Sequence, residues 1–348
     1  MLLHEFLGLE YPIIQAPMAG VQDSALAIAV CHAGGLGSLP CALLSPAAMR
    51  DELGRITAQT NTPYNVNFFC HTPPAPDPAR EQAWRAALTP YYREFGLDPE
   101  AVRAAGSRTP FSEEAASIVA EFKPPVVSFH FGLPNAALLA RVRGWGAKVL
   151  SSATTIDEAR WLEAHGADAI IAQGAEAGGH RAMFLGEDVA TQMGTLALLP
   201  QIIAAVKVPV VAAGGIADAN GVAAAMALGA AGVQVGTVYL LCPEATTSAV
   251  HRAALKSEAA RHTAITNVFT GRPARGIVNR LIRDIGPINP LAPAFPLAAH
   301  ALAPLRAKAE SLGRGDFSTL WSGQNASGCK EIPAGELTRE LTAGFRTR

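Results

Sequence analysis

The chain has 348 residues, of which 49% are hydrophobic and only 16% are charged, and its formal net charge is −1 at pH 7. This balance provides no basic surface for nucleic acid and no polybasic patch for a membrane, so neither is expected as a partner. No apolar run reaches the roughly 18 residues that a membrane helix needs. A chain of this length buries enough surface to fold without disulfides or a structural metal.

The N-terminal region and the cysteines favour a cytoplasmic protein. The first 20 residues lack a basic segment and contain Glu5 and Glu10, so no signal peptide is expected. The five cysteines are scattered and include no CxxC pair, which is typical of reduced thiols.

Short runs rich in Val and Ile alternate with Ala-rich helical patterns along the chain. The runs predict eight strands, at 11–20, 36–39, 64–69, 126–131, 148–153, 169–173, 208–213 and 232–235. The patterns predict helices at 25–32, 46–59, 135–143, 156–165, 195–206 and 219–228. Strands that are apolar on both faces belong to a parallel sheet covered by helices. Eight such units predict an α/β fold, a (β/α)8 TIM barrel, rather than a doubly wound sheet of five or six strands.

Two of the predicted helices end at a glycine. Gly166 and Gly229 each stand between a helix and the next strand, and we expect both to be C-caps with positive φ.

Two stretches do not fit the repeat. Residues 72–107 begin with four closely spaced prolines, Pro73, Pro74, Pro76 and Pro78, and continue with an amphipathic helical pattern around 81–95, which predicts a long elaborated loop. Residues 242–306, after strand eight, predict a small inserted subdomain that covers the barrel mouth. The barrel itself would then comprise residues 1–241 and 307–348, with the eighth helix at 304–311 or later.

Glycine-rich turns follow predicted strands seven and eight, where barrels of this type commonly hold a phosphate. Gly214 and Gly215 allow close backbone approach, and Gly236 with Thr237 adds N–H groups and a hydroxyl. The two strand ends comprise Ala213, Gly214, Gly215, Gln234, Val235, Gly236 and Thr237. Neither turn has the lysine of a P-loop, which argues against a nucleoside triphosphate.

Histidines are the other candidates for chemistry. His180 lies in a glycine-rich loop where packing does not require a histidine, whereas His130 lies within an apolar strand and is equally well explained as a core residue. Cys70 and His71 should point to opposite faces of their strand, which disfavours a Cys/His nucleophile. No H-E-x-x-H or G-x-S-x-G motif occurs, so we expect neither a catalytic metal nor a serine hydrolase.

Seven strand-end segments together carry a family resemblance. They read IQAPMAG at 14–20, NVNFF at 65–69, SFHFG at 128–132, SSATT at 151–155, QGAEAGGHR at 173–181, AGGI at 213–216 and QVGT at 234–237. On these segments, the chain resembles the nitronate monooxygenases, formerly called 2-nitropropane dioxygenases, and most closely their first, bacterial and fungal class. These are FMN-dependent barrel enzymes.

The resemblance implies roles for particular residues. It implies that Ala16, Pro17 and Met18 back the flavin ring and that Asn67 and Gln173 hydrogen-bond to the ring or the ribityl chain. The ribityl phosphate and its surroundings would be held by Gly178, Gly179, Ala213, Gly214, Gly215, Gln234, Val235, Gly236 and Thr237. His180 resembles the active-site histidine of the family, and His130 resembles the second pocket histidine of this class.

The chain departs from the family in the segment that supplies the substrate pocket. The family usually has tyrosines and a lysine there, but residues 295–300 contain neither, and the next lysine is Lys308. The pocket is therefore expected to be more apolar and to disfavour carboxylated substrates such as propionate 3-nitronate.

The resemblance implies oxidation of alkyl nitronates by O2 to carbonyl compounds and nitrite without NAD(P)H, in a monomer or homodimer, and it leaves the oxidation of neutral nitroalkanes open. His180 would bind the nitro oxygens if protonated or take the α-proton if neutral. Three alternatives stay open. They are an NAD(P)H-dependent FMN reductase acting on quinones or enoyl thioesters, a flavin-binding protein without turnover, and a phosphosugar barrel enzyme without flavin.

Overall fold

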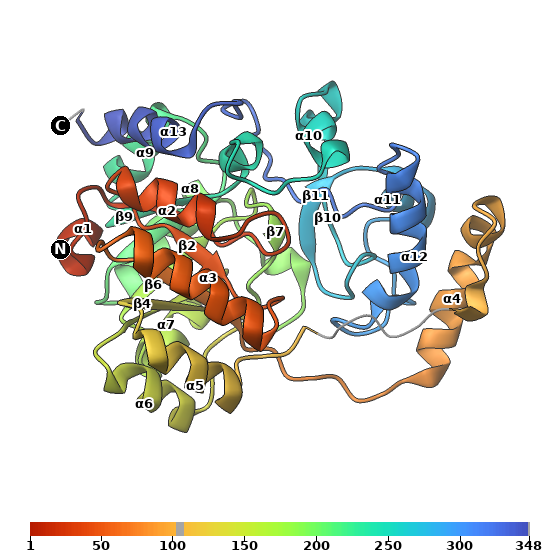
Figure 1. Ribbon diagram of the computed structural model, residues 1–348, viewed down its shortest axis with the longest axis horizontal. Coiled ribbons are helices and arrows are strands. Elements are labelled where there is room, and N and C mark those ends of the chain that lie inside the picture. Colours follow the sequence, from red (N-terminus) through yellow and green to blue (C-terminus); the bar gives the residue numbers. More distant parts are fainter. Residues whose placement is uncertain (102–107, 347–348) are drawn as a thin grey trace.

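The computed structural model describes residues 1–101 and 108–346, so residues 102–107 of the predicted loop lie outside the described residues. Its centre is an eight-stranded parallel sheet in the order β1-β9-β8-β6-β5-β4-β3-β2 (Figure 1). The strands are β1 (Ile13–Gln15), β2 (Ser38–Pro40), β3 (Asn65–Phe69), β4 (Val126–His130), β5 (Lys148–Ala153), β6 (Ala169–Gln173), β8 (Val210–Ala213) and β9 (Gly232–Val235). Each lies within or beside one of the eight predicted runs.

The two ends of this sheet meet. Ile14 of β1 forms a parallel bridge to Leu36, which lies just before β2. Its hydrogen bonds run from N of Gln15 to O of Leu36 at 3.0 Å and from N of Leu36 to O of Ile13 at 2.8 Å. The sheet is therefore closed, and the predicted (β/α)8 barrel is confirmed.

Helices surround the barrel on its outer face. They are α2 (Ser24–His32), α3 (Pro46–Gln59), α5 (Glu113–Phe122), α6 (Ala136–Gly144), α7 (Ile156–Ala164), α8 (Thr195–Ala205), α9 (Ala219–Ala227) and α13 (Ala334–Thr342). α13 packs against α2 and α9 and takes the place of the eighth barrel helix. The predicted C-caps are confirmed, because φ is 101° at Gly166 and 96° at Gly229.

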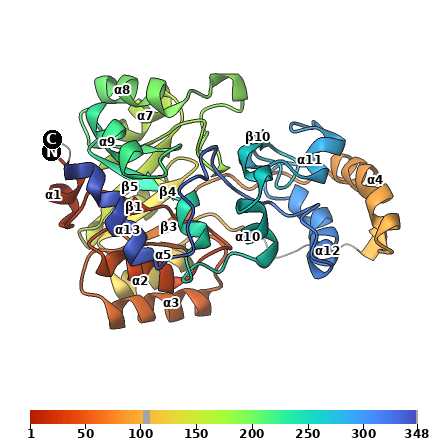
Figure 2. The same cartoon turned by 90° about the horizontal axis from the view of Figure 1, so that it is seen from above.

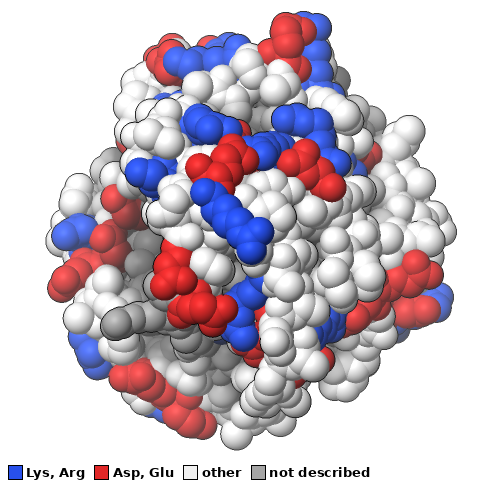
Figure 3. Space-filling view, turned by 90° about the vertical axis from the view of Figure 1, so that its right-hand side faces the viewer, with Lys and Arg blue, Asp and Glu red and all other residues white. Residues whose placement is uncertain are grey.

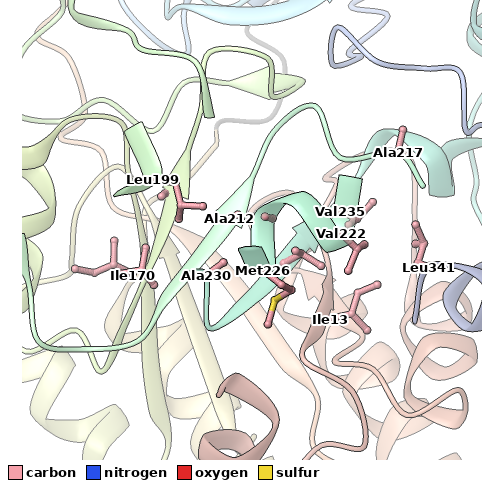
Figure 4. Packing of buried hydrophobic residues seen from close by; sticks show 14 of the residues in the cluster. Ile13, Ile170, Leu199, Ala212, Ala217, Val222, Met226, Ala230, Val235 and Leu341 are labelled. Carbon is pink, nitrogen blue, oxygen red and sulfur yellow. The ribbon is translucent and has the colours of Figure 1, made fainter. Parts of the chain in front are cut away.

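Apolar contacts fill the space between strands and helices. Ile13 and Ile170 on the strands pack with Val222 and Met226 of α9 in one buried cluster (Figure 4). At the N-terminal end of the barrel, Leu3 and other residues of α1 (Leu3–Leu7) close the interior. This end of the barrel is an apolar plug.

The barrel interior becomes polar toward the other end of the strands. Nδ2 of Asn65 donates to the hydroxyls of Ser38 and Ser128 at 3.0 and 2.9 Å. Nδ2 of Asn67 donates to the same Ser128 hydroxyl at 2.9 Å. The Ser128 hydroxyl thus accepts from both asparagines, which fixes the orientation of Asn67 at the strand ends.

A second group of elements lies beside the barrel (Figure 2). It comprises α4 (Pro78–Glu94), α10 (Ala249–Leu255), α11 (Arg280–Ile285), α12 (Ala298–Ser311), β10 (Thr263–Thr266) and β11 (Ala274–Ile277). Trp84 and Tyr92 of α4 are buried against α12, where they donate to the main-chain oxygens of Ala298 and Ala301 at 3.1 and 2.5 Å. The segment after β3 and the segment after β9 therefore share one hydrophobic cluster. The division of the chain at residues 241 and 306 stays a prediction.

A small antiparallel sheet joins this group to the barrel. β11 pairs with β10 on one edge and with β7 (Gly179–His180) on the other. In this register Ala274 lies opposite His180 and Arg275 lies opposite Gly179. The loop that follows β6 is thus held as a strand by the elements inserted after β9.

Charges of both signs are interspersed on the outer face of these elements (Figure 3). Arg280 of α11 makes a bidentate ion pair with Glu94 of α4, with both N–O distances 2.7 Å.

Within the described residues, no helix combines the length and the apolar character required to cross a bilayer.

Candidate functional site

A cavity of about 250 Å³ opens at the carboxyl ends of the barrel strands. Its lining includes almost every residue that the sequence nominated: Ala16, Pro17, Met18, Asn67, His130, Gln173, Gly178, Gly179, His180, Ala213, Gly214, Gly215, Gln234, Gly236 and Thr237. The exception is Val235, whose side chain is 1% exposed and packs in the core behind β9. Strand ends from across the barrel therefore converge on one space.

The two glycine turns have the backbone geometry expected of them. φ is 117° at Gly214 and 75° at Gly215, directly after β8, and both values favour glycine. Gly236 lies next to Ala16, since a Cβ placed on it would be 3.3 Å from the Ala16 Cβ. A larger side chain at either turn would change the backbone or the cavity floor.

The cavity is electropositive. Its lining contains Arg108 and Arg306, and none of its described lining residues is Asp or Glu. The pocket was expected to be more apolar, because residues 295–300 contain no lysine or tyrosine, but its lining includes these two cations. The cations come from α12 and from the segment before α5, rather than from residues 295–300.

Neither arginine was found from the sequence, because a single arginine in a helix or loop forms no pattern. Arg306 pairs with Glu310 at 2.9 Å and remains 45% exposed. The Arg108 guanidinium lies 5.8 Å from the centre of the Phe295 ring.

His180 occupies an aromatic enclosure at the cavity wall. Its Nε2 lies 2.9 Å from Oγ1 of Thr270. Its ring lies within 5.2 to 6.2 Å, centre to centre, of the rings of Phe295, Trp321, Phe131 and Phe69. Burial, reinforced by the charge of Arg108, holds the pKa of His180 well below its usual value. The imidazole is therefore neutral at neutral pH, which favours a base over a cationic anchor.

His130 faces the same cavity but is tied to the loop of His180. Its Nε2 lies 3.1 Å from the main-chain oxygen of His180, and because a carbonyl only accepts, Nε2 must carry the proton. Burial lowers the pKa of His130 to about 3. Gln173 supports the same loop, with Nε2 donating to O of His180 at 3.0 Å and Oε1 accepting from N of Ala182 at 2.9 Å.

Cys70 and His71 diverge, as the strand geometry predicted. Cys70 packs with the core cluster between the barrel and its helices. His71 instead lies edge-on to Phe295, with ring centres 4.8 Å apart, and burial lowers its pKa to about 4. They do not form a Cys/His pair.

The sequence analysis missed one segment of the site entirely, the residues 319–325 between α12 and α13, which we call the strap. Four alternate residues of the strap line the cavity: Thr319, Trp321, Gly323 and Asn325. N of Gly323 donates to Oγ1 of Thr237 at 2.9 Å, and Nδ2 of Asn325 donates to O of Gly215 at 3.1 Å. This alternation is the period of an extended chain, but Trp321 is the one large apolar residue among the four, so the sequence shows no apolar alternation.

Gly178 lies directly beneath the strap. A Cβ on Gly178 would be 2.5 Å from N of Gly323, so only glycine permits this approach.

Across the described part of the chain, no group of three or more His, Cys, Asp or Glu side chains is arranged to hold a metal ion.

Comparison with known proteins gives consistent results along the whole chain. A family model described as nitronate monooxygenase matches residues 1–344. A nitronate monooxygenase of Pseudomonas aeruginosa is 44% identical over 343 residues, which cover 98% of this chain and 97% of that protein.

Two solved structures are also similar. The nitroalkane oxidase of Streptomyces ansochromogenes superimposes with a TM-score of 0.89 at 39% identity, over 99% of this chain and 97% of the other. FabK of Thermotoga maritima gives a TM-score of 0.73 at 28% identity, over 99% and 95% of the two chains.

Proposed function

The chain belongs to the nitronate monooxygenase family of oxidoreductases, and from that premise we propose that it binds FMN and oxidises alkyl nitronates with O2 to carbonyl compounds and nitrite. The observation that carries this proposal is the position of His180. It lies at the wall of an electropositive cavity whose lining also contains both glycine turns.

The residues at the cavity floor fit a flavin mononucleotide. The buried Oε1 of Gln234 has no hydrogen-bond partner among the described residues, and a ribityl hydroxyl is a donor of the kind that it lacks. Nδ2 of Asn67 is occupied by Ser128, which leaves its Oδ1 as the group that would accept from the ligand.

The phosphate of FMN would be held at the two glycine turns. Gly214, Gly215, Gly236 and Thr237 offer main-chain N–H groups from two adjacent strands, and anions are held in this way at strand ends of such barrels. Gly178 and Gly179 complete the wall beneath the strap. The flavin ring would lie against Ala16, Pro17 and Met18, and when bound it supplies electron transfer to O2.

The remaining residues would act on the substrate. A nitronate is an anion, and the guanidinium of Arg108 provides positive charge beside His180. Neutral His180 would take the α-proton of a nitroalkane, and it would not be required as a base for a nitronate, which has already lost that proton. His130 would hold the His180 loop in place through the hydrogen bond to its main-chain oxygen.

The test is to load the protein with FMN and to measure O2 consumption and nitrite with ethyl nitronate in the absence of nicotinamide. We expect consumption of O2 and release of nitrite. The same preparation is mixed anaerobically with NADH and with NADPH, and we expect the flavin spectrum to change slowly or not at all.

Three results would overturn the proposal, each in favour of a different alternative. Rapid bleaching by a nicotinamide with no turnover of nitronate would identify a reductase. A flavin that remains bound without either reaction would identify a binding protein. A protein that takes up no FMN would exclude the flavin chemistry altogether.

A further inference from the structure

The hydroxyl of Thr270 lies behind the imidazole of His180, on the side away from the cavity. Thr270 is 1% exposed, and its Oγ1 lies 2.9 Å from Nε2 of His180. The same Oγ1 lies 3.4 Å from the main-chain oxygen of Arg272. One hydroxyl proton is therefore available to two neighbours, a ring nitrogen and a carbonyl.

Counting donors and acceptors decides which neighbour receives the proton. A carbonyl oxygen only accepts, whereas a threonine hydroxyl both donates and accepts. If Thr270 donates to Arg272, Nε2 of His180 carries a proton and donates to Thr270, and all three groups are satisfied. If Thr270 donates to His180, the carbonyl of Arg272 loses this donor. Buried polar groups favour the arrangement that leaves none unpaired.

We propose that Thr270 is a positioning residue that holds neutral His180 in the tautomer protonated at Nε2, and that this makes Nδ1 a base for neutral nitroalkanes. Nδ1 forms no hydrogen bond within the described residues, and the His180 side chain lines the cavity. It is thus the ring nitrogen that a substrate can reach. This inference rests on the proposed function and adds the residue that would fix which nitrogen of His180 acts as the base.

The proton transfer is balanced without an oxidant. The C–H bond at the α-carbon breaks, the proton moves to Nδ1, and the electron pair delocalises into the nitro group to form the nitronate. His180 is then an imidazolium whose Nε2–H donates to Thr270, which in turn donates to the carbonyl of Arg272. These two consecutive hydrogen bonds place two oxygen dipoles against the new positive charge.

The surroundings of His180 offer the imidazolium little other stabilisation, so these hydrogen bonds through Thr270 matter for its formation. The groups whose charges act on the imidazole are Arg108, His130, Arg272 and His71, and each of them disfavours its protonation. The aromatic rings of the enclosure exclude water but accept no proton. Oγ1 of Thr270 is the acceptor that the enclosure offers to the imidazolium.

The experiment compares the FMN-loaded wild type with Thr270→Val, which removes the hydroxyl at nearly constant volume, and with Thr270→Ser, which keeps it. The first readout is the ratio of kcat/KM for nitroethane to kcat/KM for ethyl nitronate. Loss of the hydrogen-bond partner behind a metal-ligating histidine costs about 10- to 100-fold in metal affinity or activity, and we take the lower end of that range for the metal-free His180. We expect Thr270→Val to lower the ratio about 10-fold or more, and Thr270→Ser to retain it.

The second readout does not depend on turnover. Imidazole 15N spectra of the resting holoenzyme, with the His180 signals identified from their absence in His180→Asn, report the tautomer directly. We expect protonated Nε2 and unprotonated Nδ1 in the wild type and in Thr270→Ser. If Thr270→Val fails to fold or to bind FMN, these two proteins still decide the question.

Two results would overturn the inference. One is a resting wild type with the proton on Nδ1, and the other is an unchanged nitroethane ratio in a folded, FMN-loaded Thr270→Val. Absence of nitronate oxidation in the wild type would instead refute the proposed function, and the tautomer would still be read from the spectra.

Discussion

Replacing Gly178 by alanine tests whether the strap closes the cavity. The new Cβ would lie 2.5 Å from N and 2.6 Å from the carbonyl carbon of two strap residues, Gly323 and Ser322, where ordinary contact begins at 3.4 Å. The strap must therefore move by about 1 Å, since its main chain has no flexible end that could yield.

The expected cost follows from the hydrogen bonds that such a movement stretches. N of Gly323 donates to Thr237 at 2.9 Å, N of Gln324 donates to O of Glu176 at 2.9 Å, and Asn325 donates to O of Gly215 at 3.1 Å. At about 1 kcal/mol for each bond, loss of two of them costs about 2 kcal/mol. If FMN binds beneath a closed strap, its Kd should rise about 30-fold.

The assay is a fluorescence titration of the apoprotein with FMN, together with hydrogen exchange of residues 319–325. Gly186→Ala is the matched control, because a Cβ there meets nothing within 4 Å. Wild-type FMN affinity and unchanged exchange of the strap in Gly178→Ala would refute the reasoning.

Three further predictions concern the two histidines and one arginine of the cavity. His180→Asn should reduce kcat/KM for nitroethane about 10²-fold or more and leave kcat/KM for ethyl nitronate nearly unchanged, and the exposed control His262→Asn should affect neither. Equal loss on both substrates would show that His180 does not act as a base. Arg306→Met should lower kcat/KM for propionate 3-nitronate relative to ethyl nitronate about fivefold, because an ion pair between this partly exposed guanidinium and the substrate carboxylate contributes about 1 kcal/mol. The exposed control Arg261→Met should leave the ratio unchanged. An unchanged ratio in Arg306→Met would remove Arg306 from the substrate site. Stability should fall as the pH drops from 6.5 toward 3, because burial lowers the pKa of His130 to about 3 and the unfolded chain then binds a proton that the folded chain does not. Urea titrations at pH 7 and pH 5 measure this, and His130→Gln should flatten the dependence by up to about 1.4 kcal/mol per pH unit; an equal slope in both proteins would contradict the burial argument.

The barrel was predictable because its signals are local. Each strand is a short Val- or Ile-rich run, and glycines such as Gly166 and Gly229 mark where helices end, so nearby residues suffice to recognise each unit. Since active sites of such barrels lie at the carboxyl ends of the strands, the strand assignment also located the histidines and the glycine turns.

The remaining features depend on contacts between distant parts of the chain. The pairing of α4 with α12 joins segments about 200 residues apart, as in the hydrogen bond from Trp84 to Ala298, and no periodicity within either segment specifies it. Arg108 and Arg306 reach the cavity only because these insertions are folded together. The strap was missed because its only large apolar residues are the adjacent Leu320 and Trp321, and because its course is set by partners such as Thr237 and Gly215.

The arrangement around β11 limits how this architecture can be recombined. β11 has two edges; one is occupied by β10, and the other is shared by β7 and by the strap, through the pairs His180–Ala274 and Trp321–Gly276. A chimera that exchanged only residues 242–306 for those of a related barrel would give the loop of His180 and the strap a foreign edge to pair with. Three segments that are separated in the sequence therefore form one structural unit: the loop that follows β6, strand β11, and the strap. Grafts intended to change substrate choice need to carry all three.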